Sequence, residues 1–170
     1  MGKRGEFTIN IALIEDGQPA AGIVCAPALG VCYAGAAGEG AWESDIGAED
    51  RRPISVAVPN NAALRVVASR SHLTRETESF IAANCVSECK NAGSSLKFCL
   101  LAKGEADLYP RFGPTMEWDT AAGDAVLRAA GGFVSAMDGS PMAYGKESCR
   151  NGWFIAGASG VEFTMPEELA

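Results

Sequence analysis

The first sixty residues of the chain contain short strand-like segments, and the first of them alternates as expected for a β-strand. In the segment 7–14, one face carries Phe7, Ile9, Ile11 and Leu13, and the other carries Thr8, Asn10, Ala12 and Ile14. A turn is expected at Asp16 and Gly17, and apolar runs follow at 21–26, 31–36 and 54–58, with a short strand after a connection at 38–42. The pattern predicts an antiparallel meander over residues 7–58.

The pattern changes after residue 64, where strand-like and helix-like segments alternate. Strands are predicted at 64–68, 106–109, 133–137 and 153–158, and helices from Thr74 and over 94–102. A further helix is predicted after Asp119, and it should end at Gly131 and Gly132. Such alternation is typical of a mixed sheet covered by helices. We therefore predict an α/β fold in a single domain, residues 1–170, with sub-regions 7–58 and 64–158.

Charge narrows the classes of function that fit the chain. The 170 residues contain 14 Lys and Arg against 21 Asp and Glu, which gives a net charge of −7. This balance argues against a nucleic-acid partner, because nucleic-acid-binding proteins present a basic face. No apolar run reaches the roughly 18 residues of a membrane span, and the first residues lack the apolar core of a signal peptide. No stable membrane insertion is therefore expected.

The chain has six cysteines at irregular spacings, namely Cys25, Cys32, Cys85, Cys89, Cys99 and Cys149. None of them forms a C-x-x-C pair, and zinc and redox motifs usually show paired spacing. Several lie among apolar neighbours, where a free cysteine behaves as a small hydrophobic residue. We expect all six to be reduced, in a cytoplasmic protein.

The segment 118–132 predicts a helix with a carboxylate, Asp119, at its N-terminal end. Small residues such as Ala121, Ala122 and Ala125 dominate the segment, so another element must pack closely against this helix. Asp119 has two interpretations. It is either an N-cap that accepts backbone hydrogen bonds, or a ligand for a cation at a helix terminus that also attracts an anion.

Three further segments carry side chains that suit a phosphorylated ligand. His72, the only histidine, follows a predicted strand, and ligands of open α/β sheets bind beyond the carboxyl ends of strands. Ser94 and Lys97 begin a predicted helix whose free N–H groups suit phosphate. Arg111 lies between aromatic residues in a loop, where a guanidinium can hold phosphate through two bonds. Taken singly, each segment also fits a structural role: an exposed histidine, serine caps beside a solvated lysine, and a surface arginine.

The run W-D-x-A-A-G…A-G-G at 118–132 resembles a signature of the inositol monophosphatase superfamily, whose members are magnesium-dependent phosphomonoesterases. The segments 5–14, 69–72, 93–100 and 108–115 resemble its branch of bacterial 3′(2′),5′-bisphosphate nucleotidases, in the same order. The resemblance implies a layered α-β-α-β-α fold, bound Mg²⁺, and removal of the 3′-phosphate of adenosine 3′,5′-bisphosphate in sulfur assimilation. It also implies that Asp119 binds the metal and the phosphate, and that His72, Ser94, Lys97 and Arg111 contact the nucleotide.

The chain departs from the family pattern at its beginning. The family places a Glu-Glu pair and an Asp-x-x-Asp-Gly-Thr turn before the Gly-Glu-Phe-Thr strand, and this sequence starts after both. We therefore expect an N-terminally truncated fold with Asp119 as its metal ligand, no identified catalytic residue and almost no phosphatase activity. An apolar sheet face without its covering helices would favour a homo-oligomer. Two alternatives stay open: an inositol monophosphatase or sugar bisphosphatase, and a non-catalytic nucleotide-binding remnant.

Overall fold

The first third of the chain folds into a five-stranded antiparallel sheet. A computed structural model describes residues 7–69 and 74–169. The sheet has the chain order β1 (Ile9–Glu15), β2 (Gln18–Ala26), β3 (Val31–Ala36), β4 (Gly40–Asp45) and β5 (Arg52–Ile54). The predicted meander is confirmed, although its last strand ends at Ile54 instead of beginning there. The polar residues before Ile54 pair with β4 instead of the apolar run after it: Arg52 lies opposite Glu43, and its guanidinium binds the Asp45 carboxylate at 2.8 Å.

The second sheet is mixed, as predicted. Its spatial order is β10 (Gly132–Ala136), β12 (Phe154–Ala158), β8 (Leu108–Arg111), β6 (Leu64–Ser69) and β7 (Val86–Ala92). Strand β6 runs parallel to β7 and β8, whereas β12 pairs antiparallel with β8 and β10. Sequence reasoning missed β7, because this edge strand is mostly exposed and its polar residues follow no alternation. It also missed the short pair β9 (Thr115–Met116) and β11 (Arg150–Asn151).

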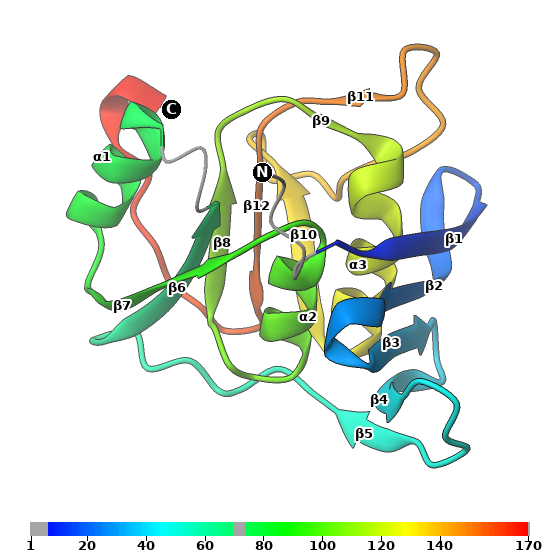
Figure 1. Cartoon of the computed structure of the whole chain (residues 1–170). Helices are drawn as coiled ribbons and strands as arrows, with labels where there is room; N and C mark the ends of the chain where they lie inside the picture. The colour runs from blue at the N-terminus through cyan, green and yellow to red at the C-terminus, as the bar shows by residue number, and fades with distance from the viewer. Residues whose placement is uncertain (1–6, 70–73, 170) are drawn as a thin grey trace, which may run out of the picture.

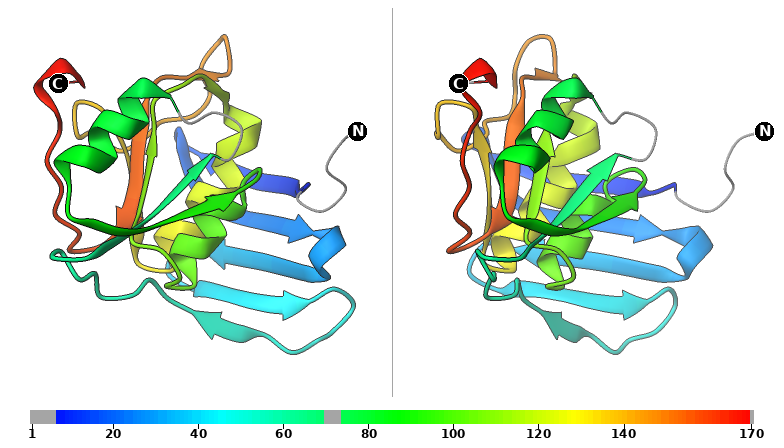
Figure 2. Two further views of the ribbon diagram at one scale, coloured as in Figure 1. Left: turned by 60° about the vertical axis from the view of Figure 1, so that its left-hand side comes forward. Right: turned by 90° about the vertical axis from the view of Figure 1, so that its left-hand side faces the viewer.

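The helices separate the structure into layers (Figures 1 and 2). Helices α2 (Leu96–Ala102) and α3 (Glu117–Ala129) lie between the two sheets. Helix α1 (Arg75–Ala83) and the C-terminal segment with its short 3-10 turn (Glu167–Leu169) cover the other face of the second sheet. The order sheet, helices, sheet, helix agrees with the last four layers of the predicted α-β-α-β-α fold.

Helix α3 packs against the first sheet at very short range, as its small residues predict. A Cβ atom added to Gly22 of β2 would come within 2.4 Å of the carbonyl oxygen of Ala122. One added to Gly35 of β3 would lie 2.8 Å from the Cβ of Ala129. The helix ends as predicted, because Gly131 takes a positive φ of 92° just after it. Strands β2 and β3 thus fix the position of the helix that carries Asp119.

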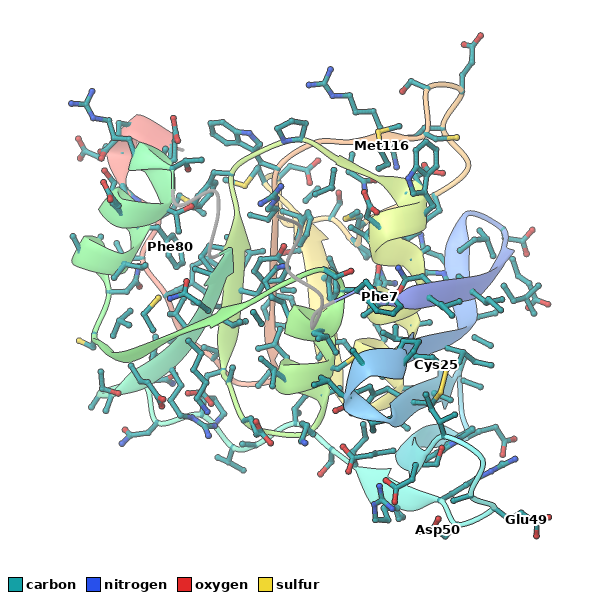
Figure 3. All side chains as sticks on the ribbon, viewed as in Figure 1. Phe7, Cys25, Glu49, Asp50, Phe80 and Met116 are labelled. Carbon is teal, nitrogen blue, oxygen red and sulfur yellow. A yellow bond between two sulfur atoms is a disulfide. The ribbon has the colours of Figure 1, made fainter. Side chains whose placement is uncertain are left out.

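Two hydrophobic clusters fill the spaces between these layers. The larger lies between the sheets and includes Val24, Phe98 and Val126, which are all almost fully buried. The smaller joins the second sheet to α1 and the C-terminal segment, and Phe80 of α1 is buried in it (Figure 3). Cys85 lies beyond the end of α1 at Ala83 and is exposed.

The outer face of the first sheet is apolar and uncovered in the described residues, as predicted. Ile9, Ile11 and Leu13 of β1 are each more than half exposed. The expectation of six free thiols is wrong, because Cys25 and Cys32 form a disulfide (Figure 3). They lie directly opposite each other on β2 and β3, a register that spacing alone does not reveal. Within the described residues, no helix has the length and apolar character needed to cross a membrane.

Candidate functional site

A cavity of about 240 Å³ opens where the start of α2, the end of β8 and the first turn of α3 meet. It is lined by Ser94, Ser95, Lys97, Phe98, Tyr109, Arg111, Thr115, Asp119 and Thr120. The structure therefore brings together four of the five side chains that sequence reasoning singled out. The fifth, His72, lies outside the described residues.

Asp119 lies inside the first turn of α3, so its interpretation as the N-cap is wrong. The helix begins at Glu117, and Met116 occupies the capping position without a side-chain capping bond. The Asp119 side chain is exposed towards the cavity, and no described side chain forms an ion pair with it. The positive end of the helix dipole favours a carboxylate at this position.

This carboxylate fits one ligand position of a Mg²⁺ ion, which prefers oxygen ligands and keeps several of its waters. Mg²⁺ is commonly held by one or two carboxylates together with substrate phosphates. Among the described residues, no group of three or more His, Cys, Asp or Glu side chains could form a complete cage. Asp119 is thus a candidate for a shared metal ligand, with phosphate and water at the other positions.

Arg111, at the end of β8, presents an unused hydrogen-bond donor. One of its terminal nitrogens donates to the carbonyl oxygen of Pro114 at 3.3 Å. Its Nε atom is buried and has no hydrogen-bond partner among the described residues. A buried donor without a partner costs free energy, so such an atom usually marks a ligand or water position. Arg111 is half-buried, so the alternative of an exposed surface arginine does not describe it.

Lys97 lies inside the protein, so the alternative of a solvated lysine is wrong. Only 5% of the residue is exposed. Its ammonium donates to the carbonyl oxygens of Ser94 at 2.7 Å and Ala92 at 3.3 Å. It also lies 5.2 Å from the centre of the Tyr109 ring, a distance at which a cation is attracted to the ring face. Lys97 thus shapes the turn before α2, and its contact with a nucleotide stays a prediction.

Ser94 and Ser95 form this turn. Ser94 has a φ of 50°, in the left-handed region that residues other than glycine rarely adopt. Ser95 precedes α2, but its side chain makes no capping hydrogen bond, so the capping alternative is wrong. Both hydroxyls instead contact Thr8, at 2.5 Å from Ser94 and 2.8 Å from Ser95.

Sequence reasoning missed three polar neighbours of this site: Thr8, Thr115 and Thr120. Asn151 of β11 donates to the hydroxyl oxygen of Thr115 at 3.1 Å and to that of Thr120 at 2.9 Å. These residues come from segments that the topology alone brings together. The hydrophobic pattern gave no signal for Thr8, because Thr8 and Asn10 lie on the partly buried face of the first strand, whereas the more apolar face with Ile9 and Ile11 is exposed.

Comparison with known proteins gives one consistent result. A family model described as the inositol monophosphatase family matches residues 3–158. The chain is 46% identical over 142 residues to the 3′(2′),5′-bisphosphate nucleotidase CysQ of Escherichia coli (strain K12), covering 84% of this chain and 56% of that protein. It is 41% identical over 146 residues to the CysQ of Buchnera aphidicola, covering 86% of this chain and 54% of the relative.

A solved structure extends this similarity to three dimensions. The crystal structure of CysQ from Bacteroides thetaiotaomicron matches with a TM-score of 0.82 at 42% identity. The match covers 91% of this chain and 63% of that chain. The chain thus spans little more than half the length of the curated relatives that it matches.

Proposed function

Because the chain belongs to the inositol monophosphatase family, we propose that its cavity binds adenosine 3′,5′-bisphosphate and forms one part of a site for Mg²⁺-dependent removal of the 3′-phosphate, whose remaining metal ligands the described residues of this chain do not supply. The proposal rests on one observation: a carboxylate and a guanidinium face the same cavity, and neither has its polar atoms fully engaged by described residues. Within the part of the chain that the structure describes, the Asp119 carboxylate has no ion-pair partner and the buried Nε of Arg111 has no hydrogen-bond acceptor. A carboxylate for a cation and a guanidinium for an anion suit a metal–phosphate ligand.

Each residue has a separate task in this proposal. Asp119 holds the cation near the phosphate, and Arg111 holds a phosphate oxygen through its free Nε–H. Ser94 contacts the sugar–phosphate part of the ligand, and Lys97 adds positive charge beneath the turn. A bound Mg²⁺ ion would supply Lewis-acid stabilisation of the phosphoryl oxygens. His72 is proposed as a further nucleotide contact from outside the described residues.

A nucleotide is favoured over an inositol phosphate for two reasons. The relatives at 46% and 41% identity are named as bisphosphate nucleotidases. In addition, the positive side chains Lys97 and Arg111 meet at one cavity, as a ligand with two phosphates would require. The proposal also includes a cytoplasmic location and self-association through the apolar outer face of the first sheet.

Binding and turnover of the chain 1–170 test the proposal together. Adenosine 3′,5′-bisphosphate should bind more tightly than inositol 1-phosphate in a calorimetric titration with Mg²⁺. Phosphate release should stay close to the background of Asp119→Asn, because Asp119 is the one carboxylate lining the described cavity and a single carboxylate holds few ligand positions of two ions.

Two results would contradict this account. Tighter binding of inositol 1-phosphate would overturn the substrate assignment. Rapid phosphate release that Asp119→Asn abolishes would show that the chain builds a complete catalytic site from other acids.

A further inference from the structure

Thr8 connects the first sheet to the turn that lines the cavity. It immediately precedes β1, and its hydroxyl oxygen lies 2.5 Å from that of Ser94 and 2.8 Å from that of Ser95. These contacts span more than 80 residues of sequence. They join the start of β1, a strand packed on α3, to the turn before α2, which lines the cavity.

The three hydroxyls have a definite donor order. The side-chain oxygen of Asn10 can only accept, so the Ser95 hydroxyl donates to it at 2.7 Å. Each hydroxyl has a single proton. Ser95 must therefore accept the proton of Thr8, and Thr8 must accept the proton of Ser94. The amide of Asn10 also donates to Thr8 at the longer distance of 3.4 Å.

These hydrogen bonds hold Ser94 in a backbone conformation that would otherwise be unfavourable. Ser94 has a φ of 50°, and such conformations persist only where the surroundings hold them. The Thr8 hydroxyl holds the Ser94 side chain, while the Lys97 ammonium holds its carbonyl oxygen at 2.7 Å. Because the Ser94 hydroxyl donates its single proton to Thr8, it offers its oxygen lone pairs to the cavity as a hydrogen-bond acceptor.

We propose that Thr8 is a positioning residue of this site: it acts through Ser94 and Ser95 to orient the Ser94 hydroxyl before a ligand arrives. The inference rests on the proposed function for the identity of the ligand. An orienting group that is already in place lowers the cost of ordering the site on binding. Thr8 has no place in the lining of the cavity itself, so its effect must pass through the two serines.

Thr8→Val and Thr8→Ser form a matched pair for the test. Valine keeps the shape of the side chain and removes the hydroxyl, whereas serine keeps the hydroxyl. We expect Thr8→Val to weaken the binding of adenosine 3′,5′-bisphosphate by about tenfold, the loss expected for one hydrogen bond. Thr8→Ser should restore affinity to within about twofold of the wild-type value. In the absence of ligand, the backbone amide resonances of Ser94 and Ser95 should move in Thr8→Val and not in Thr8→Ser.

The outcomes separate this inference from the proposed function. If the wild-type chain binds the nucleotide and Thr8→Val binds it with equal affinity, the role of Thr8 is overturned and the proposed function stays intact. Failure of the wild-type chain to bind would overturn the proposed function instead. In that case the amide resonances of the free protein decide the inference, and unchanged Ser94 and Ser95 resonances in Thr8→Val would overturn it.

Discussion

The carboxylate of Glu117 binds Lys146 twice, through the side-chain ammonium at 2.7 Å and through the backbone N–H at 3.0 Å. It also accepts the backbone N–H of Gly145 at 3.0 Å. Glu117 is the first residue of α3, two positions before Asp119. The contact therefore ties the start of the helix that carries the candidate metal ligand to the 144–149 loop.

Glu117 should make the stability of the protein depend on acid pH. Burial alone would raise the pKa of Glu117, but the Lys146 ammonium and the two backbone N–H groups outweigh burial and lower it. A carboxyl whose pKa is lowered by folding stabilises the protein above its unfolded pKa of about 4.3, and this stabilisation is lost as the pH falls through the folded pKa. Glu117→Gln should therefore lower the free energy of unfolding at pH 7 by roughly 1–3 kcal/mol and flatten its decline below pH 4–5.

Denaturant titrations at a series of pH values measure both effects. Glu147→Gln is the matched control, because Glu147 is exposed in the same loop. The interpretation fails if the Glu117 and Glu147 variants show the same pH dependence.

Arg111 should distinguish ligands by their number of phosphates. Arg111→Ala should weaken adenosine 3′,5′-bisphosphate binding by roughly 1.5–3 kcal/mol, the range for hydrogen bonds to charged groups. The loss for adenosine 5′-monophosphate should be smaller if the guanidinium holds the second phosphate. Calorimetric titration of both nucleotides measures the difference, with Arg150→Ala as the control because Arg150 is exposed and does not line the cavity. Equal losses for the two nucleotides would refute the selectivity of Arg111.

The thiol content tests both the disulfide and the proposed location. Protein purified without reductant and then unfolded should show four reactive thiols, because Cys25 and Cys32 are joined. Protein whose thiols are blocked at lysis should show six if the chain is cytoplasmic, since cytosolic thiols are kept reduced. Six thiols in the purified protein would contradict the disulfide, and four at lysis would contradict the location.

Strong local patterns predicted most of the fold. The alternation around Ile9 and Ile11 correctly predicted the first strand, and Gly131 correctly predicted the end of α3. The edge strand β7 left no such pattern, because its residues are mostly polar and do not alternate with apolar ones. The register that places Cys25 opposite Cys32 is likewise a tertiary property.

The site was predictable only in part for the same reason. Motifs pointed to Ser94, Arg111 and Asp119, and the fold brings them to one cavity. The position of Lys97 against the Tyr109 ring and the contact of Thr8 with Ser94 join separate segments of the chain, which sequence patterns do not reveal. Helix propensity also placed the start of α3 three residues too late, because the helix begins at Glu117, whose side chain is held by the 144–149 loop.

The most direct test of the account is the Mg²⁺ dependence of nucleotide binding in the wild-type chain and in Asp119→Asn. Mg²⁺ should tighten the binding of adenosine 3′,5′-bisphosphate to the wild-type chain by about tenfold or more, worth about 1.4 kcal/mol. It should have little effect on Asp119→Asn, whereas Asp138→Asn, at a turn away from the cavity, should behave as the wild type. An equal Mg²⁺ effect in the wild type and in Asp119→Asn would contradict the assignment of Asp119 as a metal ligand.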